Sequence, residues 1–298
     1  MKQKTAGMGF VLLFCLGIWA GMSLLPEAEE TKGRRVLFGQ GSERLYAGLP
    51  EGETETVIIE KLPAADDLFA LPDAAHPVPD AQLCSLRSMV GSFLPVEGDV
   101  MLREEVIYAL CDMALDYPLA EGITIIRGGL TGEEQNAWQK EAVERYEKVG
   151  REAAEAMALV PEGGESEHQT GWAVDIRLTG TLQMGWRDAL QRNAAGRWLT
   201  EQMGSYGFVY EGAGAACEDI HLRYVGKPMA KVIHVSGQGL EEMLSMLEKE
   251  KAVTLERNGQ VILCMQLVEE ETMQIPLGMI TRLSVDNRGR TILCATAE

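Results

Sequence analysis

Residues 166–176 read SEHQTGWAVDI, a stretch in which a histidine precedes a strand-like alternation that contains an aspartate. From Gly171 to Ile176, bulky apolar side chains alternate with glycine, alanine and Asp175. Successive residues of a β-strand point to opposite faces, so one face of this strand is suited to a hydrophobic core. The opposite face carries small side chains and one carboxylate, which leaves room for an ion and a substrate.

A second segment, residues 218–226, reads EDIHLRYVG and places Glu218 three residues before His221. The pattern from residue 221 onwards predicts another strand, on which His221 and Arg223 share a face. Two imidazoles and one carboxylate suffice to hold a catalytic zinc whose fourth position is open to water. The candidate ligands are His168, Asp175 and His221, and Glu218 is the candidate proton acceptor for hydrolysis. The combined spacing disfavours the alternative that these histidines are only buried and hydrogen-bonded.

Together the two segments resemble the motifs of the VanY-type D-alanyl-D-alanine carboxypeptidases. The shared pattern is Ser-x-His-x-x-Gly-x-Ala-x-Asp, followed further along the chain by Glu-x-x-His-x-Arg-Tyr-Val-Gly, and the similarity covers residues 83–247. The resemblance implies zinc ligands at His168, Asp175 and His221 and a general base at Glu218. It also implies that Ser166 touches the substrate or positions His168.

The chain departs from this family pattern where a substrate would be held. The family usually has Ser-Gly-Tyr-Arg-Ser before the first long helix, and here Leu130 takes the position of that arginine. Arg127, just before a Gly-Gly pair, is the candidate to grip the substrate carboxylate or to offset developing charge. Arg223 is a further substrate-site candidate, with a role in orienting the site. Residues 219–220 replace the usual Pro-Trp of the second motif.

The resemblance implies a zinc-dependent carboxypeptidase that hydrolyses the terminal D-Ala of peptidoglycan stem peptides. Two alternatives stay open: a related zinc dipeptidase or endopeptidase of the cell wall, and a non-catalytic wall-binding protein on the same scaffold. The formal charge of −18, from 45 acidic and 27 basic residues, argues against nucleic acid or an anionic membrane surface as a partner.

The first 26 residues predict a signal anchor. Lys2 and Lys4 precede an uncharged run from Thr5 to Pro26, which is as long as the ~20 residues that a spanning helix needs. Lysines on the N-terminal side favour a single-pass topology with the rest of the chain outside the cytoplasm, held to the cell membrane by this helix. A cleaved signal peptide is the alternative. Residues 27–80 are acidic and proline-containing, and they predict an extracytoplasmic linker.

Residues 81–250 predict an α+β catalytic domain with a central antiparallel sheet and flanking helices. Apolar residues recur at helical spacing from Leu102 to Met113, and residues 123–126 form a strand-like apolar run. Thr131-Gly-Glu-Glu134 matches a capping box, so a long helix is expected to begin there and to continue towards Met157.

Residues 251–298 predict a small β appendage. Asn258-Gly259 lies between two apolar runs, which is a strong hairpin pattern. Cys264 and Cys294 lie in two of the expected strands. They could form a disulfide outside the cell or remain as two buried thiols.

Overall fold

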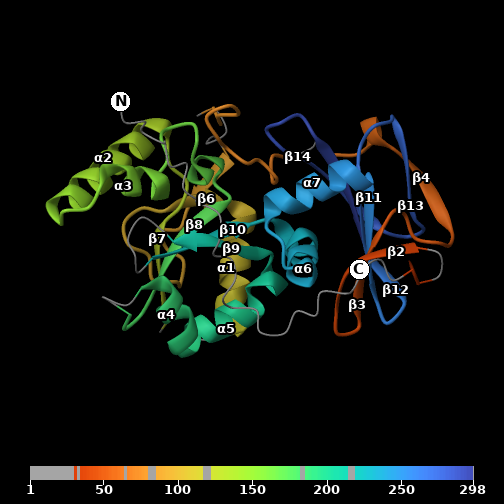
Figure 1. The fold of residues 1–298 in the computed structure, drawn as a ribbon, viewed down its shortest axis with the longest axis horizontal. Helices are drawn as coiled ribbons and strands as arrows, with labels where there is room; N and C mark the ends of the chain where they lie inside the picture. The colour runs from red at the N-terminus through yellow and green to blue at the C-terminus, as the bar shows by residue number, and fades with distance from the viewer. Residues whose placement is uncertain are drawn as a thin grey trace, which may run out of the picture.

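The computed structural model describes residues 30–31, 34–63, 66–79, 85–116, 122–181, 185–213 and 219–297. The described elements fall into two halves that lie side by side in Figure 1. One half combines helices with a four-stranded sheet, and the other is built on a seven-stranded sheet. Two helices lie between the halves, α6 (Gly226–Ser236) and α7 (Leu240–Glu250).

The four-stranded sheet forms the centre of the helix-rich half. Its strands are β7 (Ile123–Arg127), β8 (Ala173–Leu178), β9 (Phe208–Ala213) and β10 (Asp219–Tyr224). The order is β7-β8-β10-β9, and every neighbouring pair is antiparallel. Val174 and Ile176 of β8 are fully buried in the main core, as their alternation predicts. The expected α+β domain with a central antiparallel sheet is confirmed.

Helices and short strands surround this sheet. They are α1 (Glu104–Asp116), α4 (Trp186–Arg192), α5 (Ala194–Gln202), η5 (Met203–Tyr206), β5 (Leu86–Ser88) and β6 (Met101–Arg103). Helix α1 buries Val106, Leu110 and Met113, residues of the helical pattern seen in the sequence. The amphipathic face of this helix therefore covers the core.

Helix α2 (Gly132–Lys148) begins at the expected capping box. The Thr131 hydroxyl accepts a hydrogen bond from the Glu134 N–H, and the Glu134 carboxylate accepts one from the Thr131 N–H. The helix ends sooner than expected, because the chain turns at Gly150 with a φ of 75° before α3 (Ala153–Leu159). The two helices pack against each other around a small core of their own, which includes Trp138.

The strand-rich half is an antiparallel sheet with the order β1-β2-β3-β11-β12-β15-β14. Its strands are β1 (Glu30–Thr31), β2 (Arg34–Gln40), β3 (Glu43–Ala47), β11 (Ala252–Arg257), β12 (Gln260–Leu267), β14 (Ile280–Val285) and β15 (Thr291–Thr296). Asn258 and Gly259 join β11 to β12 with φ values of 52° and 78°. Positive φ at both central residues is what a tight hairpin turn requires, so the expected hairpin is present.

The prediction that residues 27–80 form a linker is wrong for most of the described part. Strand β3 pairs with β11 along its whole length, and Leu45 has no exposed surface. Further on, β4 (Thr54–Ile58) pairs with β13 (Thr272–Pro276), and η1 (Ile59–Lys61) follows. The partners of these strands lie about 200 residues away in the sequence, so no local pattern indicates the pairing.

The strands of residues 251–298 do not form a separate appendage. Leu255 and Met265 belong to the same continuous core as Val174 and Ile220 of the catalytic sheet. Helices α6 and α7 connect the two sheets, with α6 in contact with β2 and β3 and α7 with β11 and β12. The two halves therefore share one hydrophobic core.

Cys264 and Cys294 are free, buried thiols in the structure. Cys264 pairs with Ala295 across β12 and β15, whereas Cys294 pairs with Met265. Residues directly opposite each other point to the same face, so the two cysteines point to opposite faces of the sheet. Of the two alternatives that the sequence left open, the structure has the buried thiols.

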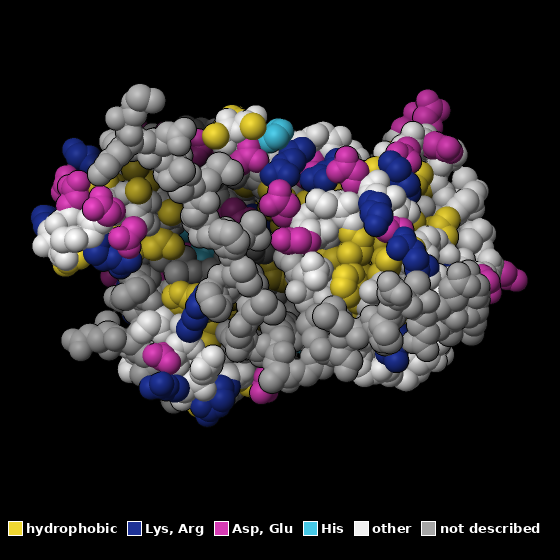
Figure 2. Space-filling model, viewed as in Figure 1, with side chains coloured by type: hydrophobic (Ala, Val, Ile, Leu, Met, Phe, Trp, Pro, Cys, Tyr) yellow, Lys and Arg dark blue, Asp and Glu magenta, His cyan; other side chains and the backbone are white. Residues whose placement is uncertain are grey.

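The expected anchor, residues 1–26, lies outside the described residues. Within the part of the chain that the structure describes, no helix is both long enough and apolar enough to cross a bilayer. On the face shown in Figure 2, acidic and basic side chains are interspersed.

Replacing Leu45 tests whether the N-terminal strands belong to the core. We expect Leu45→Ala to lower the free energy of unfolding by about 2–5 kcal/mol, because a fully buried leucine leaves a cavity. Leu49→Ala is the matched control, since Leu49 is 37% exposed and its truncation should cost only about 0.5 kcal/mol. Denaturant unfolding of the purified chain measures both. Equal, small effects would mean that β3 does not contribute to stability.

Candidate metal centre

The pairing of three strands places three charged or polar side chains in one row. Asp175 of β8 is directly opposite Arg127 of β7 on one side and His221 of β10 on the other. Because residues at the same register share a face, all three side chains lie on one side of the sheet. Asp175, in the middle of this row, has no exposed surface, whereas Arg127 and His221 on either side keep 24% and 16% of their side-chain surface exposed.

His168 reaches the row from η4 (Glu167–Thr170), a short 3-10 helix before β8. Ser166 caps this helix, and its hydroxyl accepts a hydrogen bond from the His168 N–H at 3.3 Å. The helix ends at Gly171, whose φ is 74°, and a Cβ there would lie 2.3 Å from Leu86 Cδ2. Only glycine therefore fits the turn that sends the chain from His168 back towards Asp175.

The side chains of His168, Asp175 and His221 converge. Asp175 Oδ1 is 3.3 Å from His168 Nε2 and 2.8 Å from His221 Nδ1. One ligand atom from each residue lies within 4.8 Å of the others, a spacing that could hold a metal ion. The three residues that the sequence singled out as ligands are thus brought together from η4, β8 and β10.

The other nitrogen of each imidazole faces a protein acceptor. His168 Nδ1 is 2.8 Å from the Gly128 carbonyl oxygen, and His221 Nε2 is 3.1 Å from Glu167 Oε2. An imidazole that donates from one nitrogen keeps a lone pair on the other, which is the usual arrangement of metal-binding histidines. Two such nitrogens and one carboxylate oxygen fit zinc, which takes nitrogen and oxygen ligands in tetrahedral sites.

Neighbouring charged and polar groups around the centre shift each other's pKa values towards the ionised forms. Burial would raise the pKa of Asp175, but the two imidazoles hold it well below its usual range. Burial would lower the pKa of His221, yet hydrogen bonds to Asp175 and Glu167 raise it to about 10. Two carboxylates, those of Asp175 and Glu167, flank the His221 ring and favour a cation at this position.

Arg127 lies beside Asp175 at the edge of the centre. Its guanidinium carbon is 3.6 Å from the centroid of the Trp138 ring, and its Nη1 is 3.5 Å from Asp175 Oδ2. Burial lowers the pKa of Arg127, while nearby carboxylates oppose that change. The side chain keeps 24% of its surface exposed, so a ligand could reach it. Leu130 packs instead against the small core between α2 and α3.

Comparison with known proteins identifies the family. The family model of the VanY D-alanyl-D-alanine carboxypeptidases matches residues 128–227. A D-alanyl-D-alanine carboxypeptidase of Enterococcus faecalis is 34% identical over 265 residues, which are 82% of this chain and 93% of that protein. The chain belongs to the family of D-alanyl-D-alanine carboxypeptidases. It is therefore a peptide hydrolase.

Two further proteins place this carboxypeptidase among its relatives. A D-alanyl-D-alanine carboxypeptidase of Enterococcus faecium is 23% identical over 211 residues, and the chain spans 63% of its length. The crystal structure of the vancomycin resistance D,D-dipeptidase VanXYg, solved with a D-Ala-D-Ala phosphinate analogue, is 18% identical with a TM-score of 0.61. It covers 83% of this chain and 100% of its own, so the two share a fold.

Arg223 does not line the site of this carboxypeptidase, which corrects its assignment as a substrate-binding residue. Its side chain has no exposed surface. It donates hydrogen bonds to Thr170 Oγ1 at 2.7 Å and to the carbonyl oxygens of Leu68 and Ala70 at 2.9 and 3.0 Å. Arg223 therefore joins η4 to residues 68–70 beneath the site, and a substrate cannot reach it.

Glu218, the expected general base, lies outside the described residues. The strand that follows it is firmly placed, because the buried Asp219 accepts a hydrogen bond from Arg177 Nε at 2.8 Å. Sequence reasoning missed two residues of the centre. Glu167 is adjacent to His168 in the first motif, so the sequence could have indicated it. Trp138 lies on α2, and no pattern in the neighbouring sequence links it to the metal ligands.

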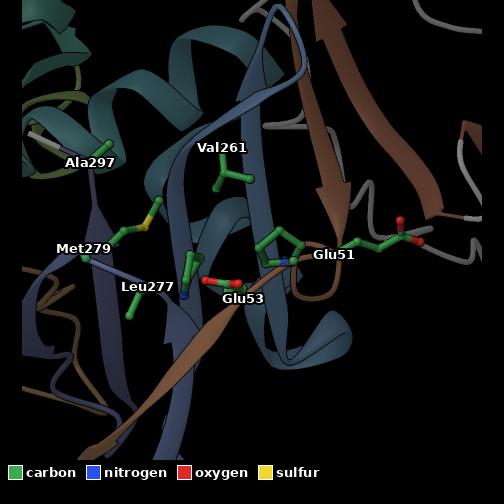
Figure 3. Close-up of a pocket in the computed structure, with 10 residues that line it drawn as sticks. Glu51, Glu53, Val261, Leu277, Met279 and Ala297 are labelled. Carbon is green, nitrogen blue, oxygen red and sulfur yellow. The ribbon is translucent and has the colours of Figure 1, made fainter.

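A surface hollow in the strand-rich half is a different place from this centre (Figure 3). It is lined by residues 50–53, Val261, residues 276–279 and Ala297. Among these described lining residues there is no histidine or cysteine, and the carboxylates of Glu51 and Glu53 are exposed. Within the described part of the chain, the group of side chains that could hold a metal ion is the one formed by His168, Asp175 and His221.

Removing any one of the three converging side chains should weaken metal binding. We expect His168→Ala, Asp175→Ala and His221→Ala each to lose bound zinc on dialysis, because each removes one of three protein donors. His234→Ala is the matched control, since His234 is a half-buried histidine of α6 that is not among the three converging residues. Elemental analysis of the dialysed proteins measures the zinc content. Full zinc retention in all three variants would exclude this centre.

Proposed function

We propose that this chain is a zinc-dependent D-alanyl-D-alanine carboxypeptidase that releases the terminal D-Ala of peptidoglycan stem peptides. The observation that carries the proposal is the convergence of His168 Nε2, Asp175 Oδ1 and His221 Nδ1, each held by the surrounding structure. Family membership supports both the reaction class and the substrate.

In this proposal His168, Asp175 and His221 hold the zinc ion. A zinc ion bound there would supply a water of lowered pKa and would polarise the scissile carbonyl. Glu218 accepts the proton of the attacking water and returns it to the amine of the leaving D-Ala. In the sequence Glu218 comes directly before Asp219, the first residue of β10, and three residues before His221.

We assign to Arg127 the binding of the negatively charged C-terminal carboxylate of the substrate. A guanidinium can bind a carboxylate with two parallel hydrogen bonds, which suits a free C-terminus. The guanidinium carbon lies 3.6 Å from the centroid of the Trp138 ring, which restrains the guanidinium, and 24% of the side chain stays exposed. Arg127 thereby supplies a cation near the site although Leu130 stands where the family's arginine would be.

The proposal also includes export. Peptidoglycan stem peptides lie outside the cytoplasmic membrane, and the substrate and the site must meet there. The lysines before the uncharged run of residues 5–26 support a single-pass anchor with the catalytic half outside the cytoplasm.

Product analysis with a Glu218 variant tests the proposed reaction. Incubation with purified muropeptides and zinc should release a single terminal alanine, read by mass spectrometry. Glu218→Gln should keep its zinc and lose turnover by at least about a hundredfold, because general base catalysis contributes ~10²–10⁴-fold. Glu201→Gln, an exposed glutamate on α5, is the control and should keep full turnover.

Other outcomes of that experiment separate the alternatives. Release of a dipeptide, or cleavage of a cross-link, would indicate the related dipeptidase or endopeptidase. Zinc-loaded protein without any turnover would indicate a wall-binding protein on this scaffold. Loss of zinc from Glu218→Gln would show that Glu218 is a ligand or a structural residue.

Protease added to intact protoplasts tests the topology. We expect digestion of the catalytic half and survival of a small membrane-bound fragment, since only the N-terminal run would be shielded by the bilayer. The readout is an immunoblot against tags at the two ends of the chain. Complete protection until the cells are lysed would place the catalytic half in the cytoplasm and contradict the proposed substrate.

A further inference from the structure

Glu167 lies between a proposed metal ligand and a buried arginine. Its Oε2 is 3.1 Å from His221 Nε2, and its Oε1 is 3.6 Å from Arg223 Nε. We propose that Glu167 is a positioning residue, which turns His221 so that Nδ1 faces the metal, and that Arg223 holds Glu167 for this task. The inference rests on the proposed function in one respect only, namely that His168, Asp175 and His221 bind a metal ion.

The first step is the effect of Glu167 on the imidazole. One nitrogen of His221 faces Glu167 and the other faces Asp175, so the ring separates Glu167 from the metal side of the site. A carboxylate at Nε2 accepts the N–H there, which leaves the lone pair on Nδ1. A charged acceptor also makes the imidazole a better ligand. Glu167 therefore acts through His221 and does not contact the reacting atoms.

The second step concerns what holds Glu167. Arg223 has no exposed surface, and a buried charge is costly unless it is paired. The Glu167 carboxylate, whose Oε1 is 3.6 Å from Arg223 Nε, provides this charged partner. Arg223 also donates to Thr170 Oγ1, at the other end of η4. One guanidinium thus fixes both ends of the helix that carries His168.

The third step leads from Arg223 to the other half of the molecule. We call residues 66–79 the linking segment, because they run between the strand-rich half and the site. Leu68 and Ala70 of this segment provide the two carbonyl oxygens that Arg223 contacts. Val285 of β14 donates its N–H to the carbonyl of Asp66, and Arg282 donates to the Asp66 carboxylate at 2.7 Å. The strand-rich half thereby supports the metal centre.

A second contact of the linking segment supports the same helix. The Asp67 carboxylate accepts hydrogen bonds from Arg103 Nη2 at 2.8 and 2.9 Å and from Trp172 Nε1 at 3.0 Å. Arg103 Nε in turn donates to the Thr170 carbonyl at 2.9 Å. Two arginines, each held by the linking segment, therefore converge on the end of η4.

The experiment measures metal binding by the purified full chain. We expect Glu167→Gln to weaken zinc affinity by about 10–100-fold, the usual effect of removing a residue that orients a ligand. The affinity is measured by competition with a chromophoric chelator. When Co²⁺ replaces zinc, the visible spectrum of the Glu167→Gln protein should differ from that of the wild-type protein, because this spectrum reports the ligand geometry at the ion. Glu162→Gln changes the same charge at an exposed position of the preceding loop and should alter neither reading.

A second variant separates positioning from general stability. Glu167→Asp keeps the charge and should retain more zinc affinity than Glu167→Gln, while thermal unfolding of the metal-free proteins is followed in parallel. Unchanged affinity and cobalt spectrum in Glu167→Gln would overturn the inference. Equal losses in both variants, matched by lower unfolding temperatures without metal, would overturn it too, because they would show a structural role only.

These outcomes are independent of the proposed reaction. If the wild-type chain binds zinc but releases no alanine from muropeptides, the proposed function fails and the metal readings still test Glu167. If it releases alanine and Glu167→Gln binds zinc normally, only the inference fails.

Discussion

The antiparallel pairing of β8 with β10 is the constraint on which the rest of the structure depends. It places Asp175 opposite His221, and the pairing with β7 adds Arg127 to the same row. A slip of one residue would turn every side chain of a strand to the other face and move the carboxylate into the apolar core. The buried alternation of Val174 and Ile176 prevents that slip, so the hydrophobic core and the metal centre fix the same register.

A fully buried carboxylate is unstable unless its negative charge has partners. In this protein those partners have charged or polar partners of their own. Asp175 is surrounded by two imidazoles and a guanidinium, and His221 is backed by Glu167. Arg223 in turn faces Glu167 from a fully buried position. Buried charges are costly where a partner is missing, so a network of this kind specifies one arrangement. Its outermost members are backbone carbonyls of the linking segment, far from the reacting atoms.

The two halves of the molecule share a hydrophobic core and are also joined through the linking segment. Strands from both ends of the described chain form one sheet, and helices α6 and α7 join it to the catalytic sheet. The linking segment passes between them and bonds to both, through Asp66 to β14 and through Asp67 to Arg103 and Trp172. The strand-rich half is thus part of the support of the site as well as a source of stability.

The sequence by itself determined the features that depend on short spacings. The candidate ligands and the family follow from two short motifs, and the capping box at Thr131 and the turn at Asn258 follow from residues close together in the chain, where backbone geometry decides which groups meet. Only the tertiary structure decided that the segment expected to be a linker is core, that Arg223 is buried, that Glu167 backs His221 and that Cys264 and Cys294 face apart. Each of these depends on strands or side chains brought together from distant parts of the chain. Such contacts are chosen by burial and by pairing of charges across the whole fold, and no local pattern records them.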